Sequence, residues 1–266
     1  MNMKRLLVAV VGWLALAGVA EAALVAHWNL DDNAASTAVV ATTGSNATLT
    51  GGDNTSVVHS TDAPAGGGIT SSFLLNGTDD WVDFSASSIT WTAGAARSLS
   101  FWFKDSATPS SHYIFGHDTG GQWFIQLSSN TVVAVRGTST TRSYTVAAMG
   151  TTWHHLLVTK NTSNAVRVFL DGTESSTGSQ TISETSPMNK IGGASIFFTA
   201  ARFARVKVFD SDESANAAAL YAEATASGST IRRQAIVVGS LTHPYQPTDI
   251  DWRCSPFAAF FGALAP

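Results

Sequence analysis

The chain has 266 residues, of which 44% are hydrophobic and only 13% are charged, and its formal net charge at pH 7 is −4. No cluster of Lys and Arg exceeds a pair of residues. This argues against nucleic acid as a partner, because phosphate binding needs a concentrated basic face. Aromatic residues make up 10% of a chain rich in Gly, Ser and Thr, a composition typical of exported β-sandwiches with many turns.

The first 22 residues have the pattern of a secretory signal peptide. Lys4 and Arg5 precede an apolar run over residues 6–19, and Ala20-Glu21-Ala22 offers a small-x-small cleavage site. An uncleaved membrane anchor is the alternative, but the run is shorter than the ~20 residues that a spanning helix needs. We therefore expect cleavage after Ala22 and a secreted, extracellular or cell-surface protein. Cys254 is the one cysteine, so no internal disulfide is predicted.

Short strands are predicted through the first half of the region 23–227. Leu24, Ala26, Trp28 and Leu30 recur with the period of two that is typical of a strand. The dipeptide Asn76-Gly77 predicts a hairpin turn between apolar runs at 73–75 and 81–84. Weak strand signals lie at 47–49 and 57–59, and clearer ones at 99–103, 112–115, 122–127, 131–136 and 142–146.

The second half continues in the same way and ends in a helix. Strands at 153–159 and 166–170 flank a polar segment and predict an antiparallel hairpin, with further strands at 196–198 and 203–209. Residues 214–226 are rich in Ala, and Asp212 or Ser214 could cap a short helix there. Many short strands with one late helix predict an all-β fold, a two-sheet antiparallel jelly-roll sandwich.

Several short motifs in this order resemble one known family. They are LVAHWNLDD, FLLNGTDDWVDF, SLSFWFK, TWHHLLVTK with VFLDG, and KIGG followed by ARFARVKVFDSDE. Together they resemble the laminin G-like domain of the concanavalin A-like lectin/glucanase superfamily over roughly residues 23–227. The resemblance implies a concanavalin A-like sandwich. One departure is Phe203-Ala204-Arg205-Val206, because relatives usually carry two acidic residues in that segment.

Residues 228–266 differ in composition from the predicted domain. Four of the seven Pro residues fall in this tail, and residues 257–264 are apolar but too short to cross a bilayer. An exposed end that carries Phe257, Phe260 and Phe261 needs a partner surface. The tail is predicted either to pack on its own domain or to act as a docking segment for another protein or for self-assembly.

The sequence favours a protein that is not an enzyme. Retaining glycoside hydrolysis needs two carboxylates about 5 Å apart, and the glucanases of the resembled superfamily carry Glu-x-Asp-x-Glu on one strand. No such spacing occurs here, and no Gly-x-Ser-x-Gly elbow is present. The four Glu residues that follow the signal peptide stand apart from one another.

Metal binding is a second question. His154 and His155 are neighbours on a predicted strand, so they point to opposite faces and cannot ligate one ion. The resemblance implies a single calcium ion at the rim of the sandwich, and Asp118 in GHDTGG matches the first ligand best. Asp79 and Asp80 are a second candidate pair, with ordinary turn chemistry as the alternative.

Aromatic residues near polar ones suggest a ligand surface. Glycans bind to aromatic rings that stack on their C–H patches, with amides and carboxylates bonding the hydroxyl groups. The candidates are Trp81, Trp91, Trp123 and Gln122, each Trp having a core position as its alternative. We therefore predict a secreted, non-catalytic domain that binds a glycan or an extracellular protein. The alternatives are a structural component of an extracellular assembly or virus particle, and a glycan-active hydrolase.

Overall fold

The computed structural model describes residues 23–85, 89–107, 112–116, 124–192 and 199–225. The chain divides into two units, Met1–Ser229 and Thr230–Pro266, and all described residues lie in the first. The predicted signal peptide, the strand at 196–198 and the tail at 228–266 lie outside the described residues. So do three of the predicted site residues, Asp118, Gln122 and Trp123.

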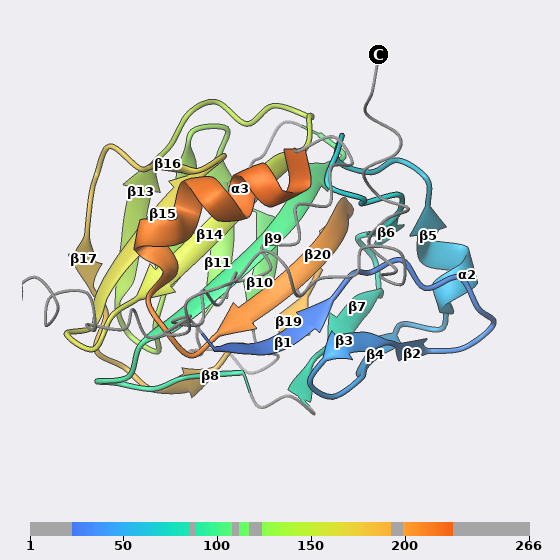
Figure 1. Ribbon diagram of the computed structural model, residues 1–266, viewed down its shortest axis with the longest axis horizontal. Coiled ribbons are helices and arrows are strands. Elements are labelled where there is room, and N and C mark those ends of the chain that lie inside the picture. Colours follow the sequence, from blue (N-terminus) through green and yellow to red (C-terminus); the bar gives the residue numbers. More distant parts are fainter. Residues whose placement is uncertain (1–22, 86–88, 108–111, 117–123, 193–198, 226–266) are drawn as a thin grey trace, which may run out of the picture. The chain divides into compact units, whose positions relative to one another are not determined.

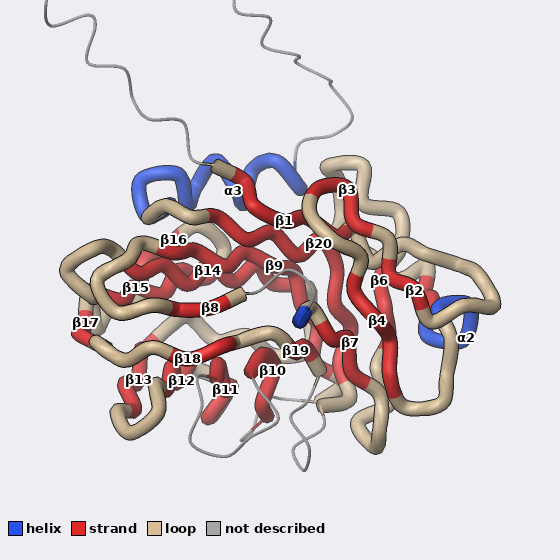
Figure 2. Tube along the Cα trace, turned by 90° about the horizontal axis from the view of Figure 1, so that it is seen from below, coloured by secondary structure: helices blue, strands red, loops and turns tan. Residues whose placement is uncertain are grey.

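Two antiparallel sheets face each other, as predicted (Figures 1 and 2). Sheet A has the order β16-β15-β14-β9-β20-β1-β3. In addition, β17 pairs with β15, β6 pairs with β20, and β5 pairs with β6. Its strands are β1 (Leu24–Trp28), β3 (Ala41–Thr43), β5 (His59–Ser60), β6 (Ser72–Leu74), β9 (Arg97–Asp105), β14 (His154–Lys160), β15 (Ala165–Leu170), β16 (Thr173–Glu174), β17 (Gln180–Thr181) and β20 (Ala201–Phe209).

Sheet B has the order β13-β12-β11-β10-β19-β7-β4-β2. Its strands are β2 (Ala38–Val39), β4 (Ala47–Thr50), β7 (Trp81–Asp83), β10 (His112–Gly116), β11 (Phe124–Ser129), β12 (Val132–Arg136), β13 (Thr141–Thr145) and β19 (Lys190–Ile191). A separate short pair joins β8 (Thr90–Trp91) to β18 (Ser186–Pro187).

The core lies between the two sheets and follows the period-two pattern. Leu99, Phe101 and Phe103 of β9 are buried on the inner face of sheet A, as their spacing predicts. The ring of Phe101 lies 5.9 Å from that of Phe115 in sheet B and 6.4 Å from that of Phe203 in β20. Burial of each such side chain stabilises the fold by about 1.5–3 kcal/mol.

The outer face of sheet A is also covered. A 3-10 turn, η2 (Glu213–Asn216), leads into the helix α3 (Ala217–Thr225), which lies across β9 and β14 (Figure 1). Asp212 caps this segment by accepting a hydrogen bond from the N–H of Ser214, which confirms the predicted cap. The ring of Tyr221 stacks on Trp102 at 5.6 Å. Both faces of β9 are therefore buried, where the alternation alone predicted one.

The predicted hairpin at Asn76-Gly77 is wrong. β6 pairs with strands of sheet A, whereas β7 pairs with strands of sheet B, so the connection crosses from one sheet to the other. The Asn76 side chain shapes this crossing by accepting hydrogen bonds from the backbone N–H groups of residues 78, 79 and 80. Gly77 has a φ of 73°, and a Cβ there would lie 2.7 Å from the backbone nitrogen of Ala200. Asn76-Gly77 therefore does form a turn, but this turn connects the two sheets and does not join two paired strands.

The predicted strand at 57–59 is also largely a helix. Thr55–Val58 forms the short helix α2, and only His59 belongs to a strand. Asn54 caps α2 through its side-chain oxygen, which accepts hydrogen bonds from the N–H groups of Ser56 and Val57. Among the residues described, no helix is long and apolar enough to cross a membrane.

Candidate functional site

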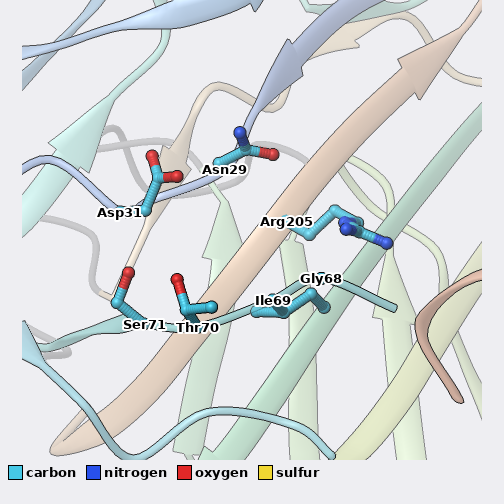
Figure 3. Close-up of a pocket in the computed structure, with 7 residues that line it drawn as sticks. All are labelled: Asn29, Asp31, Gly68, Ile69, Thr70, Ser71 and Arg205. Carbon is cyan, nitrogen blue, oxygen red and sulfur yellow. The ribbon is translucent and has the colours of Figure 1, made fainter. Parts of the chain in front are cut away.

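A small cavity beside Arg205 is the first of three candidate sites among the described residues (Figure 3). Arg205 lies at a bulge of β20 with a φ of 45°, and its Nη2 donates a hydrogen bond of 2.6 Å to the Gly67 carbonyl. Asn29, Asp31 and the segment 68–71 complete the lining. The volume is about 10 Å³, which holds about one water molecule. The cavity is therefore too small for a sugar ring.

A larger groove of about 360 Å³ runs between the end of β13 and the β15–β16 turn. Asp171 and Glu174 contribute two carboxylates to it, but Asp171 is fully engaged. Its Oδ2 accepts a hydrogen bond of 2.7 Å from Nδ1 of His154, and its Oδ1 accepts one of 2.8 Å from the N–H of His155. Glu174 pairs with Arg167 at 3.6 Å. None of the described residues that line the groove is aromatic, so they offer no ring for a sugar to stack on.

The outer face of sheet B, on the side away from α3, carries the third candidate (Figure 2). We call it the aromatic face and define it by six residues: Trp81, Tyr113, Phe124, Gln126, Arg136 and Lys190. All except the deeper Lys190 are half-buried. Their neighbours in the strands, Val82, Ile125, Val135 and Ile191, are fully buried in the core. Because side chains alternate along a strand, the six residues point outward.

Cross-strand register brings part of this face into one row. Phe124 pairs with Arg136 on one side, and Lys190 pairs with both Gly116 and Asp83 on the other. The last paired position of β10 and β11 is Phe115 with Ile125. Continuing the same register by one residue places Phe124 opposite Gly116. The row therefore runs from β12 to β7, and Gly116 contributes no side chain at its centre.

Two cations of the aromatic face lie over aromatic rings. The guanidinium carbon of Arg136 is 5.4 Å from the ring centre of Phe124, and Nζ of Lys190 is 5.2 Å from that of Trp81. Tyr113 meets Phe124 edge to face at 4.7 Å. Such contacts orient the rings and add about 0.5–1.5 kcal/mol each. The face thus presents oriented aromatic rings beside positive charge and the amide of Gln126.

Comparison with protein families identifies the domain. A model described as the concanavalin A-like lectin/glucanases superfamily, of the laminin G type, matches residues 76–217, which is more than half of the chain. The chain belongs to this superfamily. The resemblance inferred from the motifs is thereby confirmed, and so is the two-sheet antiparallel sandwich that it implied.

Solved structures share the fold of this laminin G-like domain at low sequence identity. Domain 4 of AbnA, a GH43 extracellular arabinanase from Geobacillus stearothermophilus in complex with arabinotriose, is 19% identical with a TM-score of 0.51. That match covers 76% of this chain and 99% of the other. The receptor binding domain of the botulinum neurotoxin C/D mosaic serotype is 13% identical with a TM-score of 0.54, over 75% of this chain and 51% of that one.

A sialidase shares the fold over a smaller part of its length. Trypanosoma rangeli sialidase in complex with the inhibitor DANA is 11% identical with a TM-score of 0.51, over 78% of this chain and 34% of the enzyme. No curated protein has significant sequence similarity to the chain. At these identities the structural matches show the fold alone.

The predicted ligand residues of the laminin G-like domain differ in their burial and in their location. Trp81 lies on the aromatic face and is half-buried. Trp91 is fully buried between the sheets, so its ring is not available to a ligand and that prediction is corrected. Gln122 and Trp123 directly precede β11 but lie outside the described residues.

Sequence analysis missed most of the aromatic face. Phe124 occupies the outward phase of the strand FIQLSS, because Ile125 and Leu127 take the inward phase. Arg136 ends the next strand in the same phase, opposite Phe124. The alternation was therefore a usable signal for each residue, whereas their adjacency depends on strand order.

The described residues give little support to a metal at Asp79 and Asp80. Asp79 accepts a hydrogen bond from the Asn76 side chain, and Asp80 is buried at 1% exposure, so both belong to the crossing turn. Burial first, and then the charge of Asp53, raise the pKa of Asp80. Within the described ranges, no group of three or more His, Cys, Asp or Glu side chains could hold a metal ion. His154 and His155 point to different faces of sheet A, as predicted. His154 is paired across the strands with Phe103, and His155 is paired with Trp102.

Calcium at Asp118 stays a prediction, and thermal unfolding tests it. A ligand that binds only the native state adds about 2.7 kcal/mol at 100 times its Kd. We expect millimolar Ca²⁺ to raise the melting temperature of the wild type but not of Asp118→Ala. Asp79→Ala is the matched variant at the second candidate pair. A wild-type melting temperature that does not respond to Ca²⁺ removes calcium from the account.

Proposed function

We propose that the chain is a secreted, non-catalytic laminin G-like domain that binds a glycan through the aromatic face. The observation that carries this proposal is the set of half-exposed rings of Trp81, Tyr113 and Phe124, held in one outward-facing sheet. Aromatic rings stack on the C–H faces of sugars, and the amide of Gln126 can bond a hydroxyl group.

The fold neighbours support this choice of ligand class. The arabinanase domain of the same fold was solved in complex with arabinotriose, and this chain covers nearly all of it. Stacking on the half-buried rings of a sheet face gives weak binding, of order millimolar or about 4 kcal/mol. Display of several copies on one surface would then raise the effective affinity.

Two other functions remain as alternatives. A structural component of an extracellular assembly would use the tail at 228–266 as its docking element. A glycan-active hydrolase would need two free carboxylates, and Asp171 in the groove already has both oxygens engaged. This arrangement favours binding over hydrolysis.

Alanine substitution of the rings tests the proposal. We expect Trp81→Ala and Phe124→Ala each to weaken glycan binding about tenfold, equivalent to about 1.4 kcal/mol, because each removes a stacking surface. A glycan panel followed by calorimetric titration measures the change. Arg167→Gln on β15 is the control, since its exposed ion pair with Glu174 contributes little to stability. Glycan binding that survives both ring substitutions would rule out the aromatic face as the site.

A further inference from the structure

We infer that the glycan carries carboxylate groups, as uronic or sialic-type acids do, and that Arg136 receives one of them. This inference rests on the proposed function and names the substrate class of the same face. Arg136 lies at the β12 end of the transverse row, beside the half-buried ring of Phe124. A sugar stacked on that ring brings its substituents within reach of the guanidinium group.

Arg136 has hydrogen-bonding capacity that the described structure does not use. Its Nε is buried and has no hydrogen-bond partner, and no carboxylate of the described residues forms an ion pair with the side chain. Arg167 differs, because it pairs with Glu174 at 3.6 Å. The guanidinium carbon of Arg136 lies 5.4 Å from the centre of the Phe124 ring, and a ring cannot accept all five N–H donors of the group.

A carboxylate suits these donors. The guanidinium group presents a planar fork that binds both oxygens of a carboxylate through two parallel hydrogen bonds. A carboxylate that accepts hydrogen bonds from unpaired N–H donors of this side chain gains those bonds in addition to the charge attraction. Neutral hydroxyl groups can accept one bond from Arg136 but supply no charge.

The two ends of the row differ in charge. Lys190 lies toward the β7 end, but Asp83 is 3.7 Å from its Nζ and offsets its charge. Asp79, which is exposed, precedes β7 and adds negative charge near its start. Strands lie about 4.8 Å apart, so Arg136 and Lys190 are separated by ~14 Å. We therefore place the anionic group at the Arg136 end and neutral sugar rings toward Trp81.

Paired glycans that differ only in the carboxylate test this inference. The probes are fragments of polygalacturonate and alginate, the same fragments after reduction of their carboxyl groups to alcohols, and a sulfated neutral glycan. We expect the wild type to bind the acidic fragments about tenfold more tightly than the reduced ones. Arg136→Gln should abolish this preference, whereas Arg167→Gln should keep it. Added salt should narrow the preference, since it screens the charge attraction.

Each contrary outcome overturns a defined claim. Equal binding of native and reduced fragments, or a preference that persists in Arg136→Gln, overturns the inference and leaves the glycan-binding proposal intact. Sulfated glycans that bind as tightly as the acidic fragments overturn the assignment to carboxylate. Neutral glycans that bind in a Trp81-dependent way while acidic fragments fail to bind overturn the inference alone. Failure of every glycan, acidic or neutral, overturns both.

Discussion

Replacing Trp91 with Ala is expected to lower the free energy of unfolding by about 3–5 kcal/mol, because it leaves a cavity in the core. Trp91 is fully buried in the core cluster between the two sheets, so its removal takes a large side chain out of the densely packed interior. In a domain of about 200 residues such a loss lowers the melting temperature by roughly 2–4 °C per kcal/mol. Urea denaturation of the variant and the wild type measures it.

Two further substitutions make this result specific. Trp91→Phe keeps most of the buried volume and should lose less stability than Trp91→Ala. Trp81→Ala removes a half-exposed ring and should change the free energy of unfolding by less than about 1 kcal/mol while it weakens glycan binding. A Trp91→Ala protein with unchanged stability and lost binding would return this residue to a ligand role and refute its place in the core.

Asp171→Ala is expected to lower the free energy of unfolding by about 2 kcal/mol, a figure reduced for the partial exposure of the carboxylate. Asp171 has a φ of 51° in the turn between β15 and β16, and it joins this turn to the start of β14. Nδ1 of His154 contacts the Asp171 carboxylate, and its Nε2 contacts the Met149 carbonyl and the Thr152 hydroxyl. Because a carboxylate and a carbonyl can only accept, this setting favours the imidazolium form. Removal of Asp171 leaves this imidazolium without its counter-ion.

The effect of Asp171 should depend on pH. Burial lowers the pKa of His154, but its bond to Asp171, the Asp171 charge and the bond to Met149 outweigh burial and raise the pKa above 6.5. A raised folded-state pKa stabilises the protein fully below pH 6.5, and the gain disappears as pH rises through the folded value. The stability difference between wild type and Asp171→Asn, which keeps the turn but not the charge, should therefore shrink at alkaline pH.

Glu174→Gln provides the control for both Asp171 variants. Its carboxylate lines the same groove but forms only an exposed pair with Arg167, which contributes little. Its stability should follow the wild type at every pH. A wild-type minus Asp171→Asn difference that stays constant or grows between pH 6 and pH 9 would show that His154 is neutral in the folded state.

The sequence predicted the sandwich because each buried strand carries its own signal. Leu99, Phe101 and Phe103 alternate regardless of which strand lies beside them, and the motif order indicated the family. The Asn76-Gly77 turn was misassigned because a local turn signal does not reveal which sheet receives the next strand. Trp91 was misassigned because its polar neighbours in the sequence do not cover it in the fold.

Cross-strand adjacency was the part that sequence alone could not supply. Phe124, Arg136 and Lys190 come from three strands, and only the sheet order places them in one row. Their outward phase is readable from the alternation, but their meeting depends on register. The candidate site therefore depends on the strand pairing, although the sequence alone indicates Trp81 as a candidate.

The most direct test of glycan binding at the aromatic face is an NMR titration of the isotope-labelled protein with the best ligand of the glycan panel. Our account predicts shifts confined to β7, β10, β11, β12 and β19, with the indole resonance of Trp81 among the first to move. It also predicts no shift in the groove lined by Asp171 and Glu174. Shifts that cluster at the groove, or at α3, would contradict the account and move the binding site to sheet A.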